Sequence, residues 1–147
     1  MKTTGSVTID RPIDEVFERT LANVALWSEI VVDDYVVEDV NNQGVGTRFH
    51  TTTEDRGRRM EFEGVVTDHN PPNRHQIEMT GTHFGMKVDY QFERVSSQRT
   101  KVTQNSDVQG FGLTRVVFLL CGWMFRRSSC QAVQKELENL KRYCEDR

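Results

Sequence analysis

Hydrophobic and polar positions change their spacing along this chain, and each spacing predicts a different kind of element. Residues 4–10 alternate between apolar and polar, which predicts a strand. Residues 13–21 place apolar side chains three and four apart, directly after Pro12, a residue that suits the first position of a helix. A shorter helical stretch is predicted over 24–30. The chain therefore begins with a strand and two helices.

Alternation with a period of two then continues from Tyr35 to Val108. Short turns rich in Gly, Asn, Pro and Ser divide this region into six predicted strands, at residues 35–40, 46–54, 58–69, 75–82, 86–95 and 100–108. Because the links between them are short, successive strands should pair as an antiparallel meander. The alternation predicts one apolar face and one face in contact with water.

The remaining residues predict one long helix. Apolar or small side chains recur three and four residues apart over 113–146, which is typical of a helix packed along one side. At 1.5 Å per residue it would be about 50 Å long. A domain of this size has a radius of gyration of roughly 15 Å. We therefore expect a bend or break near Gly122, or an end that projects from the body.

The start of this helix contains an unbroken apolar run over 116–125. The run is 10 residues long, about half of what a membrane-spanning helix needs, and Arg115, Arg126 and Arg127 flank it. We interpret it as a buried segment or one that lies against an apolar cavity. An interfacial helix with basic flanks is the alternative. No integral membrane segment is predicted.

Composition narrows the function classes without selecting a chemistry. The chain has 147 residues, of which 36% are hydrophobic and 28% charged, so we expect a single globular domain over 1–147. The net charge of −3 argues against nucleic acid as a partner. Three cysteines without a CxxC pair, and an amino terminus without an apolar core, predict a cytoplasmic protein. The sequence makes no prediction of the oligomeric state.

The histidines do not form a recognisable reactive site. His69, His75 and His83 lie in or beside predicted turns, and His50 has the opposite parity to the inward Phe49. We therefore predict that all four are solvated. None has a metal-ligand spacing or an assignable carboxylate partner, and no glycine-rich loop precedes a helix to bind phosphate. We expect neither a metal nor a cofactor.

A few polar residues share the parity of the inward apolar set. They are Thr51, Tyr90, Gln104 and Ser106 on predicted strands, and Arg126 within the apolar stripe of the last helix. A buried polar group left unpaired costs about 1–3 kcal/mol, so each should have a partner, a water or a ligand. Arg126 either reaches the surface or a carboxylate, or binds an acidic or carbonyl-bearing ligand.

Several local motifs occur in the same order as these elements. They are Ser6-Val7-Thr8-Ile9-Asp10 followed by Pro12 and Val16-Phe17, Trp27, Gly44-Val45-Gly46-Thr47-Arg48-Phe49, Val66-Thr67-Asp68 with Asn70-Pro71-Pro72, and Glu136-Leu137-Glu138-Asn139-Leu140-Lys141. On these motifs the whole chain resembles the START-like, or SRPBCC, superfamily with the Bet v 1-like helix-grip fold. Within it, the chain is similar to the bacterial polyketide cyclase/dehydrase and lipid-transport-like group.

The resemblance implies an α+β fold of the helix-grip type. An antiparallel curved sheet of about seven strands, in the order β-α-α-β6-α, would wrap around the long C-terminal helix and leave an apolar cavity for a hydrophobic small molecule. Combined with the parity of the strands, it predicts these cavity residues: Trp27, Phe49, Thr51, Met60, Phe62, Met79, Val88, Tyr90, Gln104, Ser106, Trp123 and Arg126.

Three functions fit this sequence. The first is a binding or carrier protein for a hydrophobic small molecule, lipid- or polyketide-like, without covalent chemistry of its own. The second is a polyketide cyclase or dehydratase in which Tyr90, Gln104 and Arg126 steer proton transfer. The third is a protein-interaction module, which an exposed apolar patch around Phe118, Leu119 and Trp123 would favour.

Overall fold

A computed structural model describes residues 2–55 and 57–146, and within them the side chains outside 117–129. Its elements, in chain order, are β1 (Lys2–Ile9), α1 (Ile13–Ala22), η1 (Val24–Leu26, a 3-10 helix), β2 (Val31–Glu38), β3 (Arg48–Asp55), β4 (Arg58–Asn70), β5 (Arg74–Thr80), β6 (Phe84–Ser96), β7 (Arg99–Gly110) and α2 (Leu113–Glu145).

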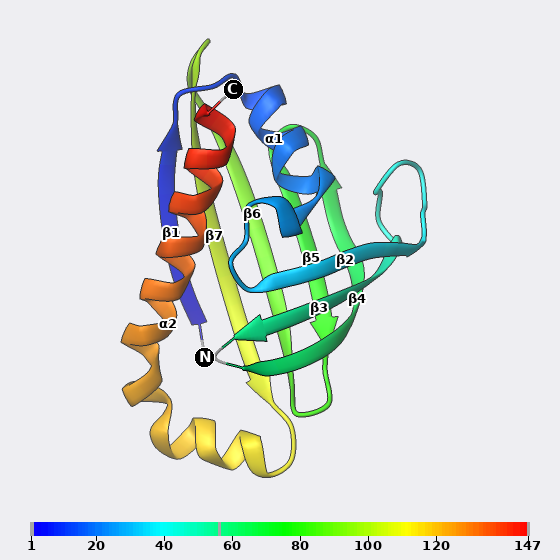
Figure 1. Cartoon of the computed structure of the whole chain (residues 1–147), viewed down its shortest axis with the longest axis vertical. Helices are drawn as coiled ribbons and strands as arrows, with labels where there is room; N and C mark the ends of the chain where they lie inside the picture. The colour runs from blue at the N-terminus through cyan, green and yellow to red at the C-terminus, as the bar shows by residue number, and fades with distance from the viewer. Residues whose placement is uncertain (1, 56, 147) are drawn as a thin grey trace.

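The strands form one sheet in the order β1-β7-β6-β5-β4-β3-β2, and every neighbouring pair is antiparallel. The meander from β2 to β7 is therefore continuous, and β1 adds to its far edge beside β7 (Figure 1). This confirms the predicted α+β helix-grip architecture. The strand–helix–helix start of the chain is also confirmed, because α1 and η1 separate β1 from β2.

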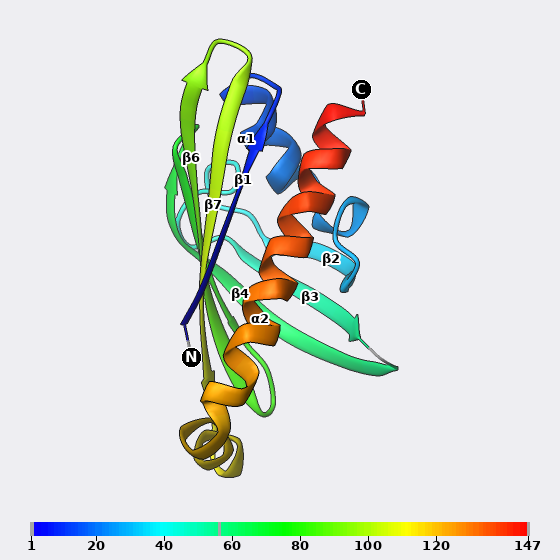
Figure 2. The ribbon, with the colours of Figure 1, turned by 90° about the vertical axis from the view of Figure 1, so that its left-hand side faces the viewer.

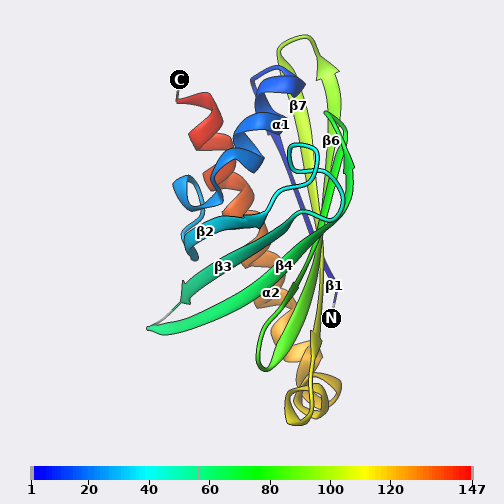
Figure 3. The same cartoon turned by 90° about the vertical axis from the view of Figure 1, so that its right-hand side faces the viewer.

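The sheet is strongly curved, and α2 lies on its concave side. Figures 2 and 3 show β3 and β4 bending away from the plane of β6 and β7, with α2 crossing the space that they enclose. Register shifts between Val66 and Asp68, and between Arg94 and Ser96, mark irregularities that add twist to the pairing. The curvature leaves room between sheet and helix.

Sheet and helix approach each other closely at β1. A Cβ atom at Gly5 would lie 3.0 Å from Val133 and 3.2 Å from Leu137, so the missing side chain lets α2 touch the strand. The core begins here and extends under α1, through Ile9, Ile13, Val16, Phe17, Trp27, Val88, Tyr90, Phe92, Val102, Leu137, Leu140 and Cys144. Sheet, α1 and the second half of α2 thus share one apolar interior.

Helix α2 is continuous over its 33 residues but not straight. Figure 1 shows its yellow first part turned away from the orange and red remainder, in agreement with the predicted bend. Near its start, Phe111, Leu113 and Val116 are exposed. The patch that an interaction module would require, Phe118, Leu119 and Trp123, lies outside the described side chains.

Two predicted boundaries are wrong at the start of the meander. The helical stretch predicted over 24–30 is only the 3-10 turn η1, because the hydroxyl of Ser28 accepts hydrogen bonds from the backbone N–H groups of Ile30 and Val31 and ends the helix there. Strand β2 then begins at Val31 and not at the predicted Tyr35. A register shift between Val31 and Asp33 breaks the period of two on which the prediction relies.

One glycine in the meander makes room for an aromatic ring. Gly64 on β4 lies opposite Phe49 on β3, and a Cβ atom there would lie 2.2 Å from Phe49 Cζ. We expect Gly64→Ala to destabilise the protein by about 1–3 kcal/mol in urea unfolding, because the ring must leave its position. Combining it with Phe49→Leu should recover part of that loss. An equal cost of Gly64→Ala in both backgrounds would contradict this interpretation.

Candidate functional site

The space between the concave sheet, α1 and α2 is a cavity of about 500 Å³. Its walls come from both helices, from η1 and the residues after it, and from the inward faces of the strands. This volume lies in the range of about 300–1,000 Å³ that small-molecule sites occupy. The fold therefore does not fill its interior with side chains.

Most of the wall is apolar and adaptable. Met60, Met79 and Met86 line the cavity together with Phe49 and Phe62. The ring of Phe62 also packs on Phe84, at a centroid distance of 5.5 Å. Thioether side chains have several rotatable bonds and polarizable sulfur, so they adjust to ligands of irregular shape.

The structure brings together most of the residues predicted from sequence to line a cavity. Those in the wall are Trp27, Phe49, Thr51, Met60, Phe62, Met79, Val88, Tyr90, Gln104 and Ser106. Trp123 and Arg126 lie in the first half of α2, among the side chains outside the described part of the chain. Contact of these residues with a ligand stays a prediction.

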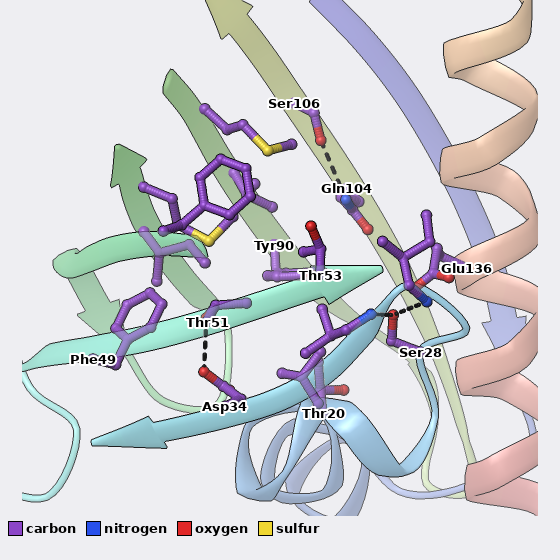
Figure 4. A pocket seen from close by; sticks show the side chains of 18 of the residues that line it. Thr20, Ser28, Asp34, Phe49, Thr51, Thr53, Tyr90, Gln104, Ser106 and Glu136 are labelled. Atoms are coloured by element: carbon purple, nitrogen blue, oxygen red, sulfur yellow. Dashed lines mark hydrogen bonds between the residues drawn. The ribbon is translucent and has the colours of Figure 1, made fainter. Parts of the chain in front are cut away.

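Two side-chain hydrogen bonds organise the polar part of the wall (Figure 4). The hydroxyl of Thr51 on β3 donates to Oδ1 of Asp34 on β2 at 2.8 Å. The amide nitrogen of Gln104 donates to the hydroxyl of Ser106, two residues along β7, at 3.2 Å. Both pairs form because residues two apart, or opposite each other on paired strands, face the same side of a sheet.

Glu136 brings a carboxyl group to the cavity from α2, besides the lining residues Asp34 and Asp55 of the sheet. It accepts a hydrogen bond from the backbone N–H of Glu29 at 3.1 Å and another from the hydroxyl of Ser28. Burial raises its pKa, and these hydrogen bonds oppose the rise. Burial likewise raises the pKa of Asp34, against the opposing hydrogen bond from Thr51.

Tyr90 on β6 completes this group of polar side chains. Burial raises the pKa of its phenol, and the negative charges of Glu136 and Asp34 raise it further. The phenol is therefore protonated at neutral pH and can donate a hydrogen bond. Tyr90, Asp34 and Glu136 thus line the same cavity from β6, β2 and α2.

Sequence reasoning missed Asp34 and Glu136, although each left a signal. Asp34 interrupts the apolar run 31–37, which is unusual for a strand with one buried face. Glu136 is three residues after Val133 and four before Leu140, so it lies on the face of α2 that carries the apolar stripe. Acidic side chains at apolar positions of the pattern are therefore the signal that could have found them.

The prediction that all four histidines are solvated is wrong for His75. It lies opposite His69 across β4 and β5, the two Nδ1 atoms are 2.9 Å apart, and Phe17 of α1 covers both rings. His75 is only 4% exposed and also lines the cavity. The tight turn at 71–73 folds β5 back on β4 and brings the two rings together.

The other histidines divide between surface and partial burial. His83 is exposed near the β5–β6 turn, as predicted. The prediction is also wrong for His50, whose side chain is only 15% exposed because Tyr35 stacks on its ring at a centroid distance of 5.1 Å. Among the residues that the structure describes, no three His, Cys, Asp or Glu side chains come together as a metal site requires.

Membrane insertion through a helix can be assessed from length and apolarity. None of the helices in the described part of the chain combines the length and apolar composition needed to cross a membrane.

Comparisons with known proteins agree on the family and the fold. The sequence model of the family described as polyketide cyclase / dehydrase and lipid transport matches residues 1–145. No curated protein matched the sequence as a relative. Solved structures match over nearly the whole chain at low identity, so they bear on the fold alone.

Three of these solved structures illustrate the similarity. A protein from Thermus thermophilus has a TM-score of 0.79 at 14% identity, covering 98% of this chain and 97% of that one. The Zhui aromatase/cyclase from a Streptomyces species has a TM-score of 0.77 at 15% identity, covering 100% and 94%. A START superfamily protein from Mycobacterium smegmatis has a TM-score of 0.68 at 14% identity, covering 95% and 98%. With the full-length match to its sequence model, this chain belongs to the polyketide cyclase / dehydrase and lipid transport family.

Proposed function

We propose that this protein binds a hydrophobic small molecule, lipid- or polyketide-like, inside the cavity. The observation that carries the proposal is the cavity itself, which is about 500 Å³ in volume and lined mainly by apolar side chains. Burying the apolar surface of a ligand there releases about 25 cal/mol per Å². The proposed contacts are the described cavity residues predicted from sequence, with Trp123 and Arg126 as further candidates.

The direct test is to purify the protein from cells and examine it by native mass spectrometry. We expect a co-purifying apolar compound that remains bound under gentle ionisation and leaves when the protein unfolds. Protein that is persistently free of ligand, and that binds no added apolar compound, would contradict the proposal.

A cavity-filling variant gives a second measurement. Val88 on β6 is buried and lines the cavity, so Val88→Phe should place a ring in the ligand space and lower affinity for an apolar probe by about tenfold or more. The matched control is Val95→Phe, on the same strand at an exposed position. We expect the control to bind as the parent protein does. Equal affinity in Val88→Phe and Val95→Phe would place the ligand elsewhere.

A second candidate function is a cyclase or dehydratase. Two carboxyls whose pKa values burial raises and a protonated phenol line the same cavity, and such groups can accept and donate protons. The test is turnover of a linear poly-β-ketone by the parent protein and by the triple variant Tyr90→Phe, Gln104→Leu, Arg126→Leu. Loss of turnover in the triple variant would support catalysis at these residues, and intact turnover would remove that site assignment.

A further inference from the structure

The polar end of the cavity is acidic. Asp34 of β2 and Glu136 of α2 both line it, and the Tyr90 phenol responds to the charge of both. Figure 4 shows Glu136 reaching in from α2 near Gln104, while the Asp34 carboxyl faces Thr51 further along the wall. A ligand whose apolar body fills the cavity would therefore present its head group to the Glu136 carboxyl, with Asp34 adding negative charge to the same wall.

In the described part of the chain, neither carboxyl has a cationic partner. Among the described residues, the basic groups that lower the two pKa values are His50 for Asp34 and Lys135 for Glu136, and each is the smallest effect on its carboxyl. Lys135 is directed to the surface, where its Nζ lies 3.1 Å from Glu29. The one basic side chain among the described wall residues is His75, and burial lowers its pKa to about 4, so it is uncharged at neutral pH. The negative charge therefore lacks compensation from the described wall.

Two further polar atoms at this end are buried and have no hydrogen-bond partner among the described residues. Gln104 and Thr53 are each only 9% exposed. Oε1 of Gln104 and Oγ1 of Thr53 have no hydrogen-bond partner among the described residues. Gln104 already uses its amide nitrogen on Ser106, so its oxygen is an acceptor that a donor in the cavity can reach. Unsatisfied buried atoms of this kind point to a missing donor.

We propose that the polar end of the cavity binds the protonated amine of a lipophilic ligand, with Glu136 as its counter-charge, the Gln104 carbonyl as a further acceptor and Asp34 as a second negative charge in the same wall. An ammonium group carries three hydrogen-bond donors and a positive charge, and so matches both the unused acceptor and the uncompensated carboxyls. A carboxylate would supply no donor and would be repelled. This inference rests on the proposed binding function and specifies its ligand class.

The test compares three probes with the same ten-carbon chain: decylamine, decanol and decanoate. Each would displace a neutral fluorescent dye from the protein at pH 7, where the amine is protonated. We expect decylamine to bind tightest and decanoate weakest, with at least about a tenfold difference between these two. Decanoate binding as well as decylamine would overturn the inference, and would favour Arg126 as an anion-binding residue.

Decanol separates the inference from the function on which it rests. If decanol binds but decylamine shows no advantage over it, the amine site is wrong while the cavity still binds apolar molecules. If none of the three probes binds, the proposed function fails with it. Loss of decylamine binding in Val88→Phe, with retention in Val95→Phe, would show that the amine enters the cavity instead of adhering to the acidic surface.

Charge-neutral variants then test the two carboxyls directly. Glu136→Gln and Asp34→Asn keep the size of the side chains and remove their negative charge. Glu136→Gln should lower decylamine affinity by about tenfold and Asp34→Asn by less, and both should leave decanol affinity unchanged. Glu138→Gln, on the exposed side of the same helix, is the matched control and should change neither. Equal losses for amine and alcohol would mean that the carboxyls shape the cavity and do not recognise the charge.

Discussion

Lowering the pH from 7 toward 4 is expected to cost this protein about 3 kcal/mol of stability through His75 alone. Burial, with a smaller effect from His69, lowers the His75 pKa from 6.5 to about 4 in the folded state. The unfolded chain therefore takes up a proton below pH 6.5 that the folded protein accepts only near pH 4. Stability falls as pH falls through this window, by about 1.4 kcal/mol for each pH unit separating the two pKa values.

The measurement is urea unfolding at a series of pH values in the parent protein and in His75→Asn. Asn keeps a polar group near the Nδ1 position and does not titrate, so its stability should depend less on pH over this window. Comparison with the variant is needed because Asp34 and Glu136, whose pKa values burial raises, act in the opposite direction. His83→Asn, at an exposed position, is the control and should keep the parent slope. An unchanged slope in His75→Asn would contradict the assignment.

Replacement of Leu137 by alanine is expected to destabilise the fold by about 2–5 kcal/mol. Leu137 is fully buried on the face of α2 that touches β1, within the cluster formed with Ile9 and Leu140. Because Gly5 allows the strand to approach the helix at this point, the packing is tight on both sides. Truncation removes apolar contacts and leaves a void that a rigid sheet edge fills only in part.

The control for this prediction lies on the same helix. Leu113 is 79% exposed, so Leu113→Ala should change stability by no more than about 0.5 kcal/mol in urea unfolding. A loss for Leu137→Ala that is equally small would show that α2 does not anchor to β1 as the structure describes. The comparison separates the cost of burial from the small difference in helix propensity.

Local hydrophobic patterns were sufficient to predict the helices and strands and to predict which strand residues face the interior. Met86, Val88 and Tyr90 alternate with polar residues, and an antiparallel strand with one covered face requires that alternation. Boundaries failed where the period was interrupted, at the irregularity after Val31 and at the Ser28 hydroxyl that ends η1. Such side-chain bonds to the backbone do not change hydrophobic periodicity, so the pattern could not predict them.

Contacts between elements that are distant in the sequence could not be predicted from hydrophobic periodicity. His69 and His75 are each typical of solvated turn residues, and only the pairing of β4 with β5 under Phe17 buries the second ring. The fold class could be predicted because hydrophobic periodicity is a local property of each strand and helix. The order of these elements follows directly from their order in the sequence. The presence of Asp34 and Glu136 in one cavity wall depends on the curvature of the sheet and on where α2 crosses it. Those are consequences of packing between residues about a hundred positions apart, which no local spacing records.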